Sequence, residues 1–122
     1  MPRFVILEHD WNGTHWDLML EVDGVLRAWA LDAPIMRGVD VPARALPDHR
    51  ILYLDYEGQV SGDRGVVRRW DRGEYEVQDW TSVLIRVHLV GDQLVGGAEL
   101  RMVGSGEGEL PSRWVFRLGN VD

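Results

Sequence analysis

Residues 4–31 read FVILEHDWNGTHWDLMLEVDGVLRAWAL, and this stretch decides the fold. It begins with a compact apolar run over residues 4–8. After a polar turn it continues with a segment in which polar and apolar residues alternate over residues 15–22. Such alternation places successive side chains on opposite faces of a strand. An Asp-Gly pair then predicts a hairpin that returns the chain along residues 25–31. The stretch therefore predicts three antiparallel strands.

The rest of the chain continues with short apolar segments between turn signals. Residues 32–48 hold three prolines without a clean period and are expected to form a long surface connection, and residues 57–65 a loop. A turn is expected at residues 71–73. Further strands are expected at residues 50–56, 66–70, 74–77, 82–90, 94–102 and 113–118. Fourteen glycines and no amphipathic helical period favour an all-β barrel or sandwich in one domain, residues 1–122.

The composition excludes several classes of protein. The chain has 122 residues, of which 45% are hydrophobic and 27% charged, as in an ordinary globular domain. It has no apolar run long enough to span a membrane and no signal-peptide pattern, so we expect a cytoplasmic protein without a membrane partner. The absence of cysteine excludes a disulfide scaffold, a thiolate zinc site and a cysteine nucleophile.

The charge is acidic overall, but every basic residue is an arginine. Thirteen arginines and no lysines stand against 20 acidic residues, which gives a net charge of −7. This balance argues against non-specific coating of DNA, because such binding depends on many phosphate contacts. It leaves room for a local phosphate site, since arginine binds phosphate in bidentate fashion. Exclusive use of arginine is also typical of a GC-rich genome.

Three polar side chains in the opening stretch form a candidate metal site. His9 ends the first expected strand, His15 begins the second, and Asp17 follows on the same face as His15. A tight hairpin between the strands brings His9 beside His15. Two imidazole nitrogens and one carboxylate oxygen suit a divalent transition metal with open positions for water or substrate. The alternative interpretation is a polar strand face without a metal.

His49 and Tyr53 form a second candidate pair, four residues apart. An imidazole can act as a general acid or stabilise a developing negative charge, and a tyrosine hydroxyl can donate to a phosphate oxygen. Tyrosine in a strand is also a common packing residue. His88 alternates with apolar residues and is expected to be structural or exposed.

Other residues near the candidate site have supporting roles in this interpretation. Trp11 lies in the hairpin and is the tryptophan best placed to stack on a base. Glu8, Asp10 and Glu21 are the nearest acids that could accept a hydrogen bond from a metal-bound imidazole. Four further tryptophans are expected to fill the core: Trp16, Trp29, Trp70 and Trp114.

The opening stretch resembles the start of the 3′-phosphoesterase domain of bacterial DNA ligase D. The resemblance rests on Glu8-His9-Asp10, on the run HWDLMLE at residues 15–21, and on the Asp-Gly and Ala-Trp-Ala elements that follow. Later elements occur in the same order and extend the resemblance over nearly the whole chain: Asp48-His49 through Tyr53, Tyr56-Glu57-Gly58, Trp70 to Tyr75 and the closing strand.

The resemblance implies a single compact antiparallel β-barrel with long loops and little helix. It also implies an enzyme that trims the 3′ ends of DNA, removing a terminal ribonucleoside and then the 3′-phosphate. By position, His9, His15 and Asp17 would bind the metal, most simply Mn²⁺, with Zn²⁺ or Co²⁺ as alternatives. His49 would contact the scissile phosphate as acid or stabiliser, and Tyr53 would position it. DNA 3′ ends, and a separate ligase or repair protein, would be the partners.

Two departures from the family pattern concern positive charge. Met19 occupies the position of a family arginine, and Leu31-Asp32-Ala33-Pro34 lacks a family lysine. Such cations stabilise charge in phosphoryl transfer, and Arg27 or Arg37 could replace them from a neighbouring strand or loop. Three hypotheses remain: a 3′-end phosphoesterase, a non-catalytic metal-binding accessory module of DNA repair, and a hydrolase of a small phosphoester.

Overall fold

The structure is a computed structural model that describes residues 1–119. Within these residues the chain forms strands and one short 3-10 helix. The elements are β1 (Arg3–Asp10), β2 (Thr14–Val22), β3 (Val25–Leu31), β4 (Val41–His49), η1 (Ile51–Leu54), β5 (Gly58–Gln59), β6 (Val66–Trp80), β7 (Leu84–Gly91), β8 (Val95–Gly104) and β9 (Arg113–Leu118). No helix in this part of the chain has the length and apolarity that crossing a membrane requires.

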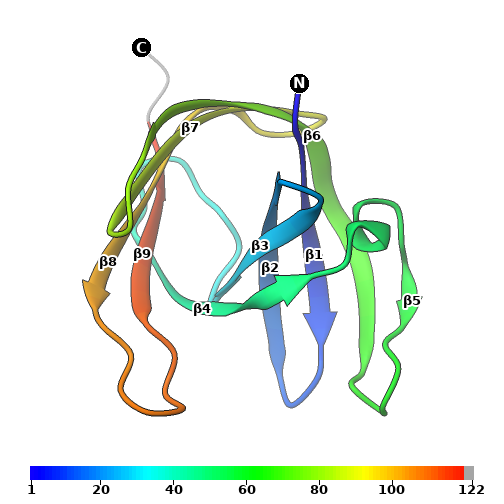
Figure 1. Ribbon diagram of the computed structural model, residues 1–122. Coiled ribbons are helices and arrows are strands. Elements are labelled where there is room, and N and C mark those ends of the chain that lie inside the picture. The colour runs from blue at the N-terminus through cyan, green and yellow to red at the C-terminus, as the bar shows by residue number, and fades with distance from the viewer. Residues whose placement is uncertain (120–122) are drawn as a thin grey trace.

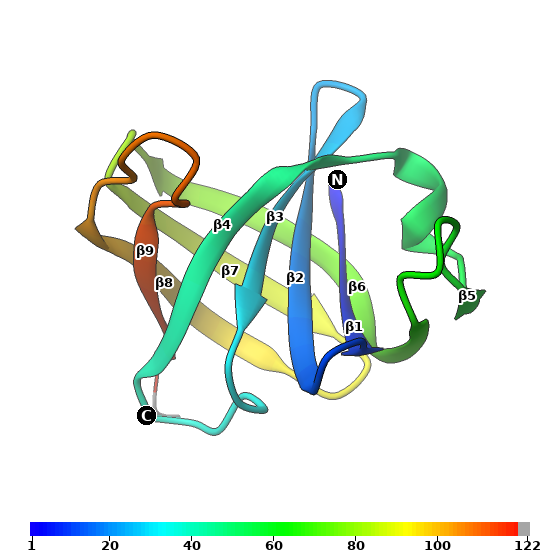
Figure 2. The same ribbon diagram turned by 90° about the horizontal axis from the view of Figure 1, so that it is seen from below.

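The strands close into an antiparallel barrel (Figure 1). Their order is β1-β2-β3-β4-β9-β8-β7-β6, and pairing of β6 with β1 completes a ring of eight strands. The two-residue strand β5 pairs with the start of β6, and both it and η1 lie outside the ring (Figure 2). The predicted all-β barrel is confirmed.

The first three strands form as the sequence predicts. Asn12 and Gly13 take positive φ angles in the β1–β2 turn, conformations that these two residue types tolerate best. The resulting register pairs His9 with His15, Leu7 with Asp17 and Val5 with Met19. Strand β3 then pairs with β2 along its length, after a turn at Asp23-Gly24.

Two apolar clusters lie on opposite sides of the barrel wall. The larger one fills the interior and includes Phe4, Leu20, Trp29 and Phe116, all nearly inaccessible to solvent. Of the tryptophans expected in the core, Trp29 and Trp114 are buried, whereas Trp16 and Trp70 are partly buried and pack against it. The smaller cluster lies outside the wall, where η1 and the chain around Val60 cover the outer faces of β1, β2 and β3.

The segment predicted as a long connection contains strand β4, so this prediction was wrong for residues 41–48. Pro42 and Pro47 argued against a strand at the level of sequence, because proline has no main-chain N–H to donate to the ladder of hydrogen bonds. Pro47 lies at a bulge, where the pairing of β4 with β3 shifts between Leu26 and Ala28. Bulges are among the few places in a sheet that accept proline.

Residues 50–56 were predicted as a strand, but Ile51–Leu54 form the 3-10 helix η1. Such a strand would place Ile51, Tyr53 and Asp55 on one face and their neighbours on the other. In the structure the adjacent residues Tyr53 and Leu54 are both buried, which a half-exposed strand does not allow. Packing of both side chains on the outer barrel wall explains the turn of helix.

The turn predicted at residues 71–73 is the middle of the 15-residue strand β6. Trp70 is the extra residue of a bulge opposite β1, which bends the strand without ending it. Asp71 is buried, and its carboxylate accepts hydrogen bonds from the main chain of Gln93 (3.0 Å) and Leu94 (2.9 Å). A residue typical of turns thus caps the neighbouring β7–β8 hairpin.

Candidate metal centre

The three candidate ligands lie together at the turn end of the β1–β2 hairpin. Their ligand atoms lie within 4.8 Å of one another. Nδ1 of His9 is 3.1 Å from Oδ2 of Asp17, and Nε2 of His15 is 3.2 Å from Oδ1. Asp17 and His9 are buried and His15 is partly buried. The alternation of β2 and the register of the hairpin produce this arrangement.

The triad fits a divalent metal ion. Oδ1 of Asp17 is buried and accepts no hydrogen bond among the described residues, although the imidazole of His15 is close. A buried carboxylate oxygen without a partner is energetically costly, and a bound cation would satisfy it. Two imidazole nitrogens and one carboxylate are also a donor set typical of catalytic metal sites that keep open positions.

The electrostatics couple His9 to Asp17. A hydrogen bond to Asp17, reinforced by one to the main chain of Arg64, raises the pKa of His9 although burial opposes this. Burial raises the pKa of Asp17, but the neighbouring imidazoles of His15 and His9 outweigh it and the pKa falls below its usual value. Asp17 is therefore a carboxylate near neutral pH, available to a cation.

The main-chain carbonyl of Arg64 orients His9. Nε2 of His9 lies 2.7 Å from this oxygen, which can only accept a hydrogen bond. The Nε2 proton is thereby held in place and Nδ1 faces the carboxylate, the usual support for a metal-bound imidazole.

The three acids expected to support the imidazoles have other partners. Asp10 accepts a hydrogen bond from the hydroxyl of Thr14, Glu21 accepts one from the main chain of Arg3 (2.9 Å), and Glu8 lies 3.5 Å from the guanidinium of Arg68. The acceptor of His9 is a main-chain atom 55 residues away. A pattern of side chains in the sequence does not indicate which main-chain carbonyl will accept a hydrogen bond from His9.

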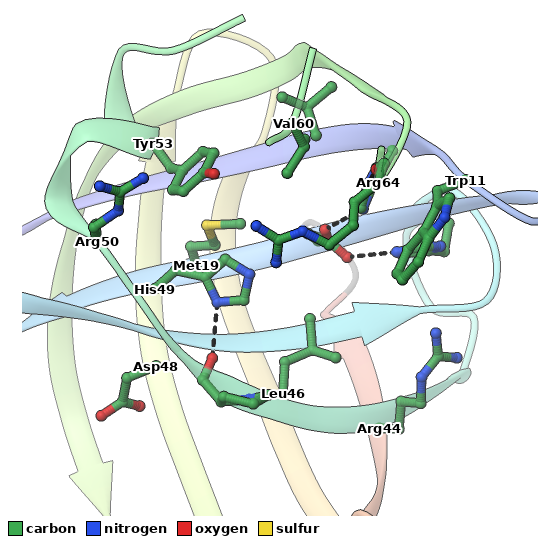
Figure 3. Close-up of a pocket in the computed structure, with 15 residues that line it drawn as sticks. Trp11, Met19, Arg44, Leu46, Asp48, His49, Arg50, Tyr53, Val60 and Arg64 are labelled. Carbon is green, nitrogen blue, oxygen red and sulfur yellow. Dashed lines mark hydrogen bonds and ion pairs between the residues drawn. The ribbon is translucent and has the colours of Figure 1, made fainter. Parts of the chain in front are cut away.

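A pocket of about 340 Å³ opens beside the triad, on the outer side of the barrel wall. It lies between the outer faces of β1 and β2, the end of β4, η1 and the loop before β6 (Figure 3). It is lined by His9, Trp11, His15, Asp17, Met19, Arg44, Leu46, Pro47, Asp48, His49, Arg50, Tyr53, Val60, Arg64 and Val67.

His49 and Tyr53 line the same pocket as the triad. Nδ1 of His49 lies 2.7 Å from the carbonyl oxygen of Pro47 and donates to it, which leaves Nε2 available to the pocket. The ring of His49 packs edge-on against Tyr53, with 5.8 Å between the ring centroids. The structure thus brings all five residues of the two predicted groups to one cavity.

The two expected substrate contacts lie in different places. Trp11 lines the pocket, is 42% exposed and stacks on His9 with the rings inclined by 24°. Arg27 shares the face of β3 that carries Trp29; its guanidinium lies 5.8 Å from the Trp29 ring centre and 3.4 Å from Asp48. Arg37 donates to the main chain of Val95, away from the pocket lining.

Three arginines that sequence reasoning missed also line the pocket: Arg44, Arg50 and Arg64. Arg44 is opposite Ala30, which is itself opposite Asp17, so knowledge of strand β4 would have placed it near the metal centre. Arg50 lies just before η1. Arg64 comes from a loop, and nothing in its sequence surroundings indicates its position.

The profile of the DNA ligase D 3′-phosphoesterase domain matches residues 7–101. This chain belongs to that family. The match spans His9, His15 and Asp17, the three candidate metal ligands, together with His49 and Tyr53.

Three relatives carry the name of the multifunctional non-homologous end joining protein LigD. The Mycobacterium tuberculosis H37Rv protein is 38% identical over 80 residues, which are 62% of this chain and 10% of that protein. The Pseudomonas aeruginosa protein is 34% identical over 86 residues, or 63% and 10%. The Mycolicibacterium smegmatis protein is 37% identical over 81 residues, or 62% and 11%. The matched region spans about a tenth of each relative's length.

Proposed function

We propose that this chain is a metal-dependent phosphoesterase that removes a 3′-terminal ribonucleoside and a 3′-phosphate from DNA. The observation that carries this proposal is the shared pocket, in which the His9–His15–Asp17 triad lies together with His49 and Tyr53. A phosphate in this cavity would contact both groups at once. Membership of a phosphoesterase family supports the same reaction class.

The bound ion, for which we propose Mn²⁺ with Zn²⁺ or Co²⁺ as alternatives, would withdraw charge from the phosphate oxygens and polarise phosphorus. His49 has its Nδ1 proton held by the Pro47 carbonyl, so Nε2 is the atom that exchanges a proton with the substrate. Tyr53 is 9% exposed and packs against His49, which orients the imidazole. The hydroxyl of Tyr53 would donate to a phosphate oxygen.

The partners in this proposal are DNA 3′ ends and a ligase or repair protein. The relatives are named for non-homologous end joining, and a phosphoesterase in that setting would prepare ends for joining. The cytoplasmic location expected from the sequence stays a prediction.

Hydrolysis of a small phosphoester is the second candidate. The net charge of −7 disfavours long contacts with DNA, and a pocket of about 340 Å³ is large enough for a phosphate with one nucleoside. This substrate would use the same residues. The third possibility, a non-catalytic accessory module, would keep the metal and lack turnover.

The test is a 3′-end assay with two primer–templates, one ending in a ribonucleotide and one in a 3′-phosphate. The parent protein with Mn²⁺ should trim both, and His49→Ala should lose turnover by about 10²- to 10⁴-fold while it binds Mn²⁺ as before. His88→Ala, on the outer face of β7, is the matched control and should behave as the parent. Unchanged turnover in His49→Ala would contradict its role.

Absence of trimming by a parent protein that still binds Mn²⁺ would refute DNA as the substrate. Nucleoside 3′-phosphates, assayed in parallel, then separate the second candidate from the third. Their hydrolysis would identify a small-phosphoester hydrolase, and its absence would leave the accessory module.

A further inference from the structure

The three arginines of the pocket differ in how they are paired. Arg44 lies 3.7 Å from the carboxylate of Asp32, which already offsets part of its charge. Within residues 1–119, Arg50 and Arg64 have no carboxylate within ion-pair distance, and the Arg50 side chain makes no hydrogen bond. Of these three arginines, Arg64 is the one that has no carboxylate partner among the described residues and whose side chain is nevertheless hydrogen-bonded in place.

The side chain of Arg64 is held by Ser61. Its Nε donates to the Ser61 carbonyl oxygen at 2.7 Å, and one terminal nitrogen lies 3.3 Å from the Ser61 hydroxyl. Two of the five N–H donors are thereby used and three remain for a ligand. In Figure 3 the guanidinium group points into the pocket, toward the side that carries Met19 and His49. A held guanidinium loses less conformational entropy when it binds.

The main chain of Arg64 is fixed to the metal centre. Its carbonyl oxygen accepts the hydrogen bond from His9, so the residue that carries the guanidinium is joined directly to one of the candidate metal ligands. Gly65 keeps the loop close to β1, with a φ of +77°. A Cβ at this position would collide with the carbonyl oxygen of Asp10.

At position 19 the pocket is lined by an uncharged methionine. Met19 is 1% exposed and belongs to the apolar cluster outside the barrel wall. A phosphate bound at the triad would develop charge on its non-bridging oxygens during the reaction, and catalysis of phosphoryl transfer depends on cations placed there. Among the described residues that line this pocket, Arg64 is the arginine whose side chain is hydrogen-bonded in place without a carboxylate partner.

We infer that Arg64 is the catalytic anion-binding residue of this site, and that its guanidinium contacts the non-bridging oxygens of the phosphate undergoing cleavage. This inference rests on the proposed function, since it assigns a residue to that reaction. It also places positive charge at the pocket of an acidic protein, where a 3′-phosphate needs it.

The first test is binding of inorganic phosphate to the Mn²⁺-loaded protein, measured by calorimetry without any turnover. Arg64→Ala should weaken phosphate binding roughly 10-fold or more, because hydrogen bonds to a charged group are lost. It should retain Mn²⁺ affinity, because the main-chain carbonyl that supports His9 remains. Arg64→Lys should bind with intermediate affinity, since it keeps charge and loses the planar fork. Arg101→Ala, an exposed change on β8, controls for net charge.

The second test is turnover of the 3′-phosphate primer. Arg64→Ala should lower kcat by about 10²-fold with a smaller effect on KM, as expected for charge stabilised in the transition state. Millimolar guanidinium should restore part of the rate to Arg64→Ala and leave Arg101→Ala unchanged. A residue that only shaped the loop would not be rescued in this way.

The outcomes separate this inference from the proposed function. Phosphate binding by Arg64→Ala equal to that of the parent overturns the inference, and the proposed function stands if the parent trims DNA. Phosphate binding that depends on Arg64 in a parent without turnover keeps the anion site and refutes the proposed function. A parallel loss of Mn²⁺ affinity in Arg64→Ala would show that the side chain acts through His9, and would also overturn the inference.

Discussion

The two faces of strand β2 differ in what covers them. Leu18 and Leu20 point into the barrel, where the other strands enclose them. Asp17 and Met19 point outward, where η1 and the loop before β6 provide the cover. The inner face is closed by regular pairing, whereas the outer face depends on irregular chain that can leave a pocket. A single alternating strand thus supplies stability on one side and chemistry on the other.

The largest expected effect is the loss of metal binding, without loss of stability, when a candidate ligand is removed from the outer face of β2. His15→Ala removes one of three candidate ligands from the outer face, so Mn²⁺ binding should be lost while the thermal unfolding temperature without metal stays close to that of the parent. Calorimetric titration and circular dichroism measure the two quantities. His88→Ala should bind the metal normally. A His15→Ala protein that holds Mn²⁺ as tightly as the parent would show that the ligand assignment is wrong.

A substitution on the inner face of the same strand should lower stability and leave metal binding unchanged. Leu20 is fully buried in the barrel interior, so Leu20→Ala should lower the free energy of unfolding by about 2–5 kcal/mol. Mn²⁺ affinity of the folded protein should change little, because the triad lies on the other face. Val90→Ala, at a site 48% exposed, should cost far less in urea denaturation. If Leu20→Ala weakens metal binding as strongly as stability, the two faces are not independent.

The smallest expected effect concerns the ion pair that joins the end of η1 to strand β1. Asp55 follows η1 and binds Arg3 of β1, with one nitrogen–oxygen distance of 2.7 Å. The hydrogen bond from Arg3, helped by the charge of Arg72, lowers the pKa of Asp55 from its ordinary value of 3.8. The stabilisation is therefore present above this ordinary value and is lost as pH falls through the lower pKa of the folded state.

Asp55→Asn should remove that small contribution near neutral pH and leave stability unchanged in strong acid. Urea denaturation at about pH 7 and at successively lower pH values below 3.8 follows the narrowing of the difference between parent and variant. Asp79→Asn, an exposed change on β6, is the control. A variant whose stability differs from the parent equally at every pH in the series would show that charge is not the cause.

Much of the candidate metal centre was predictable because its geometry is local. His9 and His15 flank a turn whose Asn-Gly pair determines the hairpin, and pairing across that turn puts the two imidazoles side by side. The alternation of side chains along residues 15–22 is enough to place Asp17 on the same face as His15. The approach of His49 to this triad was not predictable from spacing, since strand β4 was obscured by its prolines and η1 was taken for a strand.

The arginines show where sequence reasoning ends. Arg27 was proposed as a replacement cation because β3 neighbours β2, yet alternation turns its side chain to the face of Trp29. Arg64 is 47 residues beyond Asp17 in the chain but lines the same pocket. Its position depends on a loop that Gly65 allows to approach the end of β1, and on the hydrogen bond that Nε2 of His9 donates to the main-chain carbonyl of Arg64.

The sequence by itself determined the all-β class, the first three strands, the two faces of β2 and the relation of His9, His15 and Asp17. These features depend on alternation and turn chemistry, which act between neighbouring residues. Only the tertiary structure decided that β6 runs unbroken, that η1 covers the outer wall, and that Arg44, Arg50 and Arg64 surround the pocket. Those features depend on closure of the barrel, because contacts between distant segments override the local preferences of the residues involved.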